Sequence, residues 1–169
     1  MLPFDVVKVI FYNCDFRTQI NIKKTCRKYY TIPIKVIPHR YGGLLNDDIL
    51  LCYPYLEFLY LCNISKVSDR GVKKLRNLKI LYAYGGKYND ITDHGVKELK
   101  NLTELYADYN TKITDLSVKE LPNLKILNAS ANPNITDLGV KELKNLTKLY
   151  AYKNRNITIV STDKLRVYR

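Results

Sequence analysis

The sequence predicts an α/β solenoid, with a parallel sheet on its concave face, short helices on its convex face and a small helical module at its N-terminus. Three observations predict this fold. The pattern L-x-x-L recurs at nearly constant spacing, most copies continue into I-T-D-x-G-V or a close variant of it, and the first 33 residues do not fit the repeat. Repeats this short bury their apolar faces only by stacking into one continuous core.

The repeats divide most of the chain. Five copies of 22, 24, 22, 22 and 24 residues begin at Leu56, Leu78, Leu102, Leu124 and Leu146. A fainter copy precedes them, with Ile34 and Ile37 in place of the first two leucines. We therefore expect a helical module over 1–33 and repeats over 34–169, with boundaries at 34–55 (degenerate), 56–77, 78–101, 102–123, 124–145 and 146–169.

The first half of each repeat is predicted to be a strand, as in LKILYAY (78–84). Side chains alternate between the two faces of a strand. Leu81 and Ala83 then face the core, and Tyr82 and Tyr84 face outward. A small alanine lets the second layer approach the sheet closely.

The second half of each repeat is predicted to be about two turns of helix. Aspartate is a good N-cap residue, and it stands at the start of this segment in four copies (Asp69, Asp93, Asp115 and Asp137). Val96 and Leu99 lie three residues apart, which places both on one helical face. That face should pack against the sheet.

Residues 34–169 resemble the leucine-rich repeat family, L-x-x-L-x-L-x-x-N/C-x-L. The I-T-D-x-G-V tail is similar to the cysteine-containing subtype found in F-box proteins. The chain departs from the family where alanine replaces the third framework leucine, at Ala83, Ala107, Ala129 and Ala151. The resemblance implies that Asn110, Asn132 and Asn154, at the ninth position, bind the turn backbone of adjacent repeats.

Residues 1–33 contain the string L-P-x-D-V-V-x-x-I, then D-F, then C-R-K-Y. This string resembles an F-box. The residues that match are Leu2, Pro3, Asp5, Val6, Val7, Ile10, Phe16, Ile20, Cys26, Arg27 and Tyr29. The chain departs from the F-box pattern in its short length and in a tyrosine where tryptophan is usual.

Together the two resemblances imply a substrate receptor that binds the Skp-type adaptor of a cullin ubiquitin ligase and holds an unknown protein substrate on its repeats. The resemblance assigns adaptor contact to Leu2, Pro3, Val6, Val7, Ile10, Phe16 and Ile20. Under a rival interpretation, the first helices only cap the open core of a plain repeat scaffold. Proteins of this architecture also occur in giant DNA viruses, which would place the chain in a host cytoplasm.

The tyrosines mark the expected partner surface. Rigid aromatic rings with a polar hydroxyl suit protein interfaces. The predicted binding face on the concave surface consists of Tyr60, Tyr82, Tyr84, Tyr106, Asp108, Tyr109, Asn128, Tyr150 and Tyr152. Equivalent tyrosines in adjacent repeats also lie side by side, so a cross-strand stacking ladder is a compatible interpretation.

The net charge is +12 and the pI is about 9.5, which raises the question of nucleic acid. Most lysines, however, fall in the V-K-K-L and V-K-E-L segments of the convex side, interspersed with glutamates and facing away from the tyrosines. We therefore do not expect nucleic acid to be the main partner. A basic nucleic-acid-binding protein remains the second rival interpretation.

No catalytic, metal or cofactor motif is present in the sequence, so we predict neither an enzyme nor a cofactor. His39 and His94 have no partner motif, and no Walker, G-x-S-x-G or H-E-x-x-H pattern occurs. The four cysteines (Cys14, Cys26, Cys52 and Cys62) form no C-x-x-C pair, so reduced thiols are expected and zinc is not.

The two ends of the sequence carry further expectations. The N-terminus lacks the pattern of a signal peptide and no apolar run is long enough to span a membrane, so we expect a cytoplasmic chain. The last repeat lacks the aspartate and glycine of its second half. We expect the open edge at the C-terminus either to fray or to pair with another copy of the chain.

Overall fold

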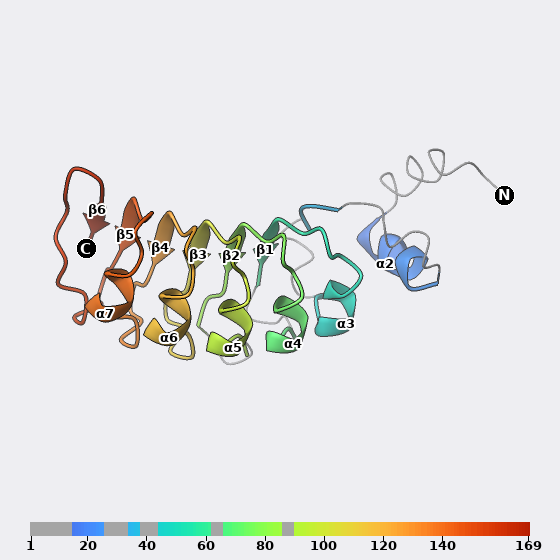
Figure 1. The fold of residues 1–169 in the computed structure, drawn as a ribbon. Helices are drawn as coiled ribbons and strands as arrows, with labels where there is room; N and C mark the ends of the chain where they lie inside the picture. Colours follow the sequence, from blue (N-terminus) through green and yellow to red (C-terminus); the bar gives the residue numbers. More distant parts are fainter. Residues whose placement is uncertain (1–14, 26–33, 38–43, 62–65, 86–89) are drawn as a thin grey trace.

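The computed structural model describes residues 15–25, 34–37, 44–61, 66–85 and 90–169. Figure 1 shows the repeats stacked in one row, with the strands along one side and the short helices along the other. The helix α2 (Phe16–Thr25) lies at the N-terminal end of the row. The fold is the predicted leucine-rich-repeat solenoid.

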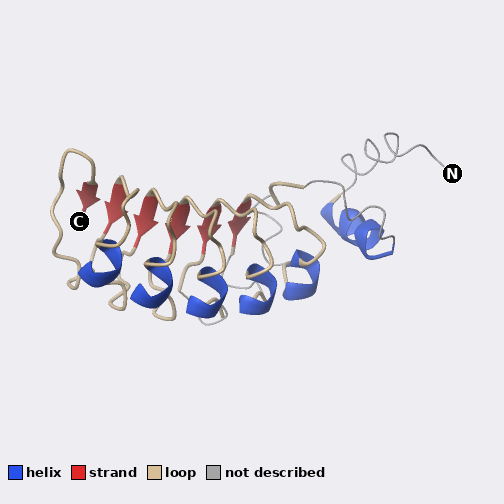
Figure 2. Ribbon diagram, in the orientation of Figure 1, coloured by secondary structure: helices blue, strands red, loops and turns tan. Residues whose placement is uncertain are grey.

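The strands form one parallel sheet in sequence order (Figure 2). Its strands are β1 (Phe58–Tyr60), β2 (Ile80–Tyr82), β3 (Glu104–Tyr106), β4 (Ile126–Asn128), β5 (Lys148–Tyr150) and β6 (Arg166–Tyr168). Equivalent residues of consecutive repeats are paired, so Leu81 lies between Leu59 and Leu105. Because of this register, residues at the same position of successive repeats form a row across the sheet.

The opposite layer contains four-residue helices, which are α3 (Asp47–Leu50), α4 (Asp69–Val72), α5 (Asp93–Val96), α6 (Asp115–Val118) and α7 (Asp137–Val140). The prediction of about two turns was wrong. After one turn the backbone changes to tighter bonds: the Leu99 N–H donates to the Val96 carbonyl, and the Leu102 N–H to the Leu99 carbonyl. Bonds of this spacing end an α-helix, while Val96 and Leu99 still lie in the core as predicted.

The N-cap assignment was wrong by one residue. In α6 the cap is Thr114, whose backbone is extended (φ −128°, ψ −178°) and whose side chain accepts from the Leu116 N–H. Ser68, Thr92 and Thr136 cap the equivalent helices in the same way. Serine, threonine and aspartate all cap helices well, so a threonine followed by an aspartate leaves the sequence ambiguous by one position.

The aspartates instead connect neighbouring repeats. The Asp93 carboxylate accepts from the Thr114 N–H at 2.8 Å and from the Thr114 hydroxyl at 2.7 Å. The same arrangement joins Asp47 to Ser68, Asp69 to Thr92, Asp115 to Thr136 and Asp137 to Thr158. The Asp47 carboxylate also occupies the space beside Gly71, where a Cβ would lie 2.6 Å from Asp47 Oδ1. This contact favours a small residue at this position, which is glycine in most copies and Ser117 in α6.

We predict that Thr114→Val lowers the free energy of unfolding by about 1–2 kcal/mol, because it removes both a helix cap and a hydrogen bond to a carboxylate. Chemical denaturation followed by circular dichroism measures the change. Thr111→Val is the matched control, since Thr111 is exposed. Equal effects of the two substitutions would contradict the role given to Thr114.

The core runs the length of the solenoid. Ala83, Ala107 and Ala129 have no exposed surface, and Ala151 is 2% exposed, which confirms that these alanines face the second layer. Each buried asparagine at the ninth position binds the preceding repeat, and Asn110 Nδ2 lies 2.9 Å from the Ala83 carbonyl oxygen. The structural role implied for these asparagines is confirmed.

The degenerate first repeat occupies the same layers. Val36 forms a parallel bridge with Phe58, and α3 packs beside α4 as the later helices pack beside one another. Ile37 and Tyr53 are buried at framework positions. We retain residues 34–55 as our proposed first repeat.

The helix α2 packs onto this repeat. Asp15 accepts from the Thr18 N–H at 3.0 Å, in the manner of an N-cap. The Phe16 ring stacks on Tyr53 with 5.8 Å between centroids, and Ile20 is also buried. Lys23 Nζ lies 4.8 Å from the centre of the same Tyr53 ring, and burial lowers the pKa of Lys23 to about 8. These contacts cover the open end of the repeat core.

We expected the last predicted repeat to leave an open sheet edge at the C-terminus, and the structure differs. The chain supplies the parallel strand β6, which pairs with β5. The outward side of β6 is also occupied, because the Val167 N–H donates to Ser161 Oγ at 2.9 Å. The guanidinium of Arg169 donates to the Ile159 carbonyl. The described C-terminal residues therefore close the sheet within the chain, and self-association through this edge loses its structural basis.

Candidate functional site

The outward side of the sheet carries an aromatic cluster. It consists of Phe58, Tyr60, Tyr82, Tyr84 and Tyr106, each half-buried. Tyr82 stacks on Tyr106 with 4.1 Å between centroids and 3° between ring planes. Tyr60 lies 5.5 Å from Tyr82 and 5.9 Å from Tyr84. The parallel register places Tyr60, Tyr82 and Tyr106 side by side, which confirms the predicted stacking ladder.

A second pair lies at the C-terminal end of the sheet. Tyr150 stacks on Tyr168 with 4.8 Å between centroids and 15° between planes. Sequence reasoning missed Tyr168 because the last repeat had lost its helix pattern. The alternation of Leu165, Val167 and the outward Tyr168 was the signal that could have found this strand.

Polar side chains separate the two groups of rings. Asn128 Nδ2 donates to Asp108 Oδ1 at 3.2 Å, and Asn128 Oδ1 accepts from the Ser130 N–H at 3.0 Å. Asp108 is 9% exposed, and burial raises the pKa of its carboxyl. Burial, followed by the nearby Asp108 charge, raises the pKa of Tyr84. Tyr106 donates its hydroxyl to Glu104 Oε2 at 3.0 Å.

Tyr109 and Tyr152 lie outside both stacks. Tyr109 has a left-handed backbone (φ 59°) and is 59% exposed at the turn after β3. Tyr152 is 55% exposed, with Lys153 Nζ 5.1 Å from its ring centre. We use the name tyrosine face for the outward side of the sheet. It comprises the aromatic cluster, the Tyr150–Tyr168 pair and the outward residues beside them. All nine residues of the predicted binding face belong to it.

The predicted adaptor-binding residues fall into two groups. Leu2, Pro3, Val6, Val7 and Ile10 lie outside the described residues. Phe16 and Ile20 are 4% and 6% exposed and face the repeat core. We correct their assignment accordingly: both side chains join α2 to the first repeat, and direct contact with an adaptor has no support from their positions.

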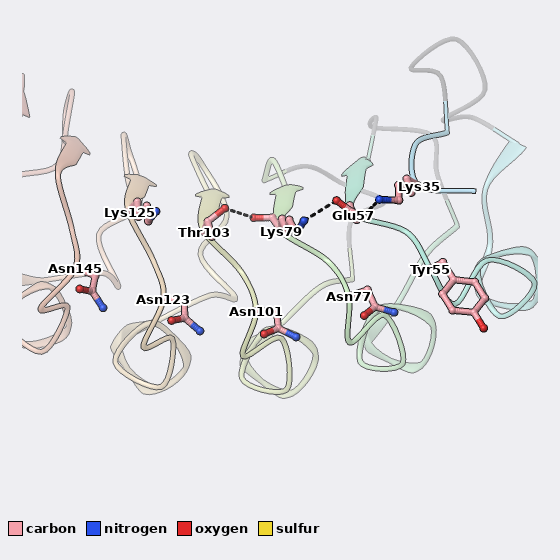
Figure 3. A pocket seen from close by; sticks show the side chains of 10 residues that line it. All are labelled: Lys35, Tyr55, Glu57, Asn77, Lys79, Asn101, Thr103, Asn123, Lys125 and Asn145. Carbon is pink, nitrogen blue, oxygen red and sulfur yellow. Dashed lines mark hydrogen bonds and ion pairs between the residues drawn. The ribbon is translucent and has the colours of Figure 1, made fainter. Parts of the chain in front are cut away.

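A polar groove runs along the side of the sheet where the strands begin (Figure 3). Asn77, Asn101, Asn123 and Asn145 form a row, and each donates to a carbonyl of the preceding repeat. Beside them, Glu57 lies between Lys35 and Lys79, with both N–O distances at 2.7 Å. These polar groups hold neighbouring repeats together.

The Glu57 ion pairs predict a pH dependence. Hydrogen bonds from Lys35 and Lys79 lower the pKa of Glu57 to about 2, against about 4.3 in an unfolded chain. A lowered carboxyl pKa adds stability that is complete above about pH 4.3 and is lost as pH falls through about 2. We expect Glu57→Gln to destabilise the protein at pH 6 and to have little effect near pH 2. Glu142→Gln, on the helix side, should show no such trend in denaturation curves.

Within the described part of the chain, no group of three or more His, Cys, Asp or Glu residues is arranged to hold a metal ion. No helix there is both long and apolar enough to cross a membrane. Cys52 is buried, and its thiol donates to the Asp48 carbonyl oxygen at 3.5 Å. His94 is exposed at the start of α5, and His39 lies outside the described residues.

The stacked repeats, most with a strand of one parallel sheet and a short helix on the other side, define a leucine-rich-repeat fold. The comparisons agree: the family described as "Leucine Rich repeats (2 copies)" matches residues 100–145, and the F-box domain family matches residues 1–40. The chain is thus an F-box/leucine-rich-repeat protein. Both parts are interaction modules, which gives the chain a protein-interaction role.

Two solved structures are similar to this chain. The yeast complex of Rad7 and Elc1 contains a chain that matches with a TM-score of 0.50 and 15% identity, over 75% of this chain and 44% of that one. The functional domain of InlJ from Listeria monocytogenes matches with a TM-score of 0.45 and 24% identity, over 73% and 31% of the two chains. The protein thus spans less than half of either structure. A search of curated proteins found no match.

Proposed function

We propose that the protein is a substrate receptor of a Skp/cullin/F-box ubiquitin ligase. The F-box at the N-terminus docks the Skp-type adaptor, and the tyrosine face holds a protein substrate. The observation that carries the proposal is the F-box match at residues 1–40, immediately before a repeat solenoid. The receptor performs no chemistry of its own, so the ligase supplies the transfer of ubiquitin.

The outward rings support the second half of the proposal. Five aromatic side chains lie within contact of one another on β1 to β3 and the segment after β2. Stacking fixes their rotamers, so little side-chain entropy is lost when a partner covers them. Rigid aromatic anchors of this kind contribute most of the affinity in many protein interfaces.

A pull-down with a purified Skp-type adaptor tests the first half. We expect the full chain to retain the adaptor and Leu2→Ala/Val6→Ala to lose it. Tyr82→Ala/Tyr106→Ala is the matched control, because it alters only the tyrosine face and should bind the adaptor normally. Circular dichroism confirms that each variant folds.

The rival proposal, a scaffold whose N-terminal helices serve only as a cap, is favoured by the packing of Phe16 and Ile20 on the first repeat. The two proposals predict different pull-downs. If the folded full chain does not bind the adaptor, and Leu2→Ala/Val6→Ala changes nothing, the scaffold is the remaining function. A cap and an adaptor-binding surface can also occupy different faces of the same helices.

A further inference from the structure

Charge is unevenly distributed along the tyrosine face. One register row crosses the sheet at the first residue of each strand, in the order Phe58, Ile80, Glu104, Ile126, Lys148 and Arg166. Its first charged residue is acidic and its last two are basic. Asp108, four residues after Glu104, adds a second carboxylate near β3. The face therefore has an acidic middle and a basic C-terminal end.

The acidic residues lack an internal cation. Glu104 accepts from the Tyr106 hydroxyl and Asp108 from the Asn128 amide. Among the described residues, no lysine or arginine lies within 4.0 Å of either carboxylate. Glu57, in contrast, is held between two lysines. Glu104 is half-buried, so in a chain of net charge +12 its carboxylate can bind a basic group of a ligand, whereas Asp108 is 9% exposed and is hydrogen-bonded within the protein.

The aromatic rings beside these carboxylates indicate which kind of basic group the face would bind. Tyr106 lies between Glu104 and Asp108 in the sequence and stacks on Tyr82, which in turn lies 6.1 Å from Tyr84. A guanidinium group stacks on aromatic rings and pairs with carboxylates at the same time. The acidic middle of the face therefore suits an arginine side chain.

The basic end suits the opposite charge. Lys148 and Arg166 are both exposed and occupy paired positions on β5 and β6. In the described structure neither has a carboxylate within 4.0 Å. The Tyr150–Tyr168 pair lies on the same strands and offers apolar contact beside the two charges. A carboxylate of a partner can bind both groups.

We propose that the tyrosine face binds an extended segment of the partner protein in a single orientation, with an arginine or lysine at Glu104 and an acidic residue at Lys148 and Arg166. The two sites lie two to three strand spacings apart, which is roughly 10–14 Å at about 4.8 Å per spacing. An extended chain rises about 3.3 Å per residue. The basic and acidic residues are then three or four positions apart. This inference rests on the proposed role of the tyrosine face as the substrate surface.

Selection of a random peptide library on the immobilised full chain tests the proposal. Glu104→Lys and Lys148→Glu alter the two sites separately. Glu142→Lys and Lys119→Glu are the matched controls, because they make the same changes in charge at exposed positions on the helix side. Thermal unfolding of each variant establishes that it is folded. The selection contains no adaptor, so its outcome is separate from that of the adaptor pull-down.

We expect the unmodified chain to enrich peptides that carry a basic and an acidic residue three or four positions apart, in one order. Glu104→Lys should remove the preference for the basic residue and Lys148→Glu the preference for the acidic one, and both controls should keep the pair. The affinity of a selected peptide should fall about tenfold or more in each site variant. Enrichment of acidic residues alone, equal effects of the controls, or no enrichment would overturn the proposal.

Discussion

Asn132→Ala is expected to lower the free energy of unfolding by about 3–4 kcal/mol. The Asn132 amide has no exposed surface. Its Nδ2 donates to three carbonyl oxygens of the preceding repeat, at 2.6 Å from Asn110, 3.1 Å from Ile113 and 3.2 Å from Ala107. Alanine removes these three buried bonds, each worth about 0.5–1.5 kcal/mol, and leaves a cavity where the amide lay, which adds to the loss.

Two further variants establish that the donor is responsible. Asn132→Asp keeps the shape and the acceptor oxygen but loses the donor at neutral pH, so it should be at least as destabilising as alanine. Asn134 donates to the Thr111 carbonyl at an exposed site, and Asn134→Ala should cost less than about 1 kcal/mol. Denaturant unfolding monitored by circular dichroism suits a chain without tryptophan. A stable Asn132→Asp variant would contradict this account.

Gly85→Ala is expected to destabilise the protein by about 3 kcal/mol, which is at the upper end for overpacking because the obstacle is backbone. A Cβ at Gly85 would overlap the Tyr109 carbonyl group and lie 2.6 Å from the Asn110 nitrogen. The Gly85 N–H also donates to the Asp108 carbonyl at 2.9 Å. The two segments therefore cannot separate without breaking a bond between adjacent repeats.

Thermal unfolding measures this effect. For a chain of this size the midpoint should fall by roughly 6–12 °C, at about 2–4 °C per kcal/mol. Gly71→Ala is the control, because its new Cβ would meet mainly the Asp47 side chain, and Ser117 already occupies the equivalent place in α6. We expect this control to cost less than about 1 kcal/mol. A Gly85→Ala variant as stable as the control would contradict the close contact between Gly85 and the Tyr109 carbonyl group.

The sequence was sufficient to predict the solenoid because one pattern repeats. Each leucine, alanine or asparagine occurs at the same place in several copies, and stacking gives equivalent residues the same environment. The cap was misassigned because Thr114 and Asp115 both suit a helix start. The helix length was overestimated because Leu99 faces the core equally well from a turn. Neither error changes which side chains are buried.

The candidate site was partly predictable. Tyr82 and Tyr106 could be placed side by side, since repeat spacing fixes their register. Tyr168 could not be found from the repeat pattern, because the chain reaches β6 through a loop without a helix among its described residues. The contact of Phe16 with Tyr53 joins segments of different pattern, so no periodicity predicts it. The resemblance that assigned Phe16 to an adaptor gave no information about this internal contact.

Hydrogen exchange of the full chain with and without a Skp-type adaptor tests the central claim most directly. The proposed division of roles predicts that the adaptor protects backbone amides within residues 1–15 and leaves exchange in β1 to β5 unchanged, since the tyrosine face stays free for a substrate. Absence of protection in the N-terminal segment, or protection centred on Tyr82 and Tyr106, would contradict it.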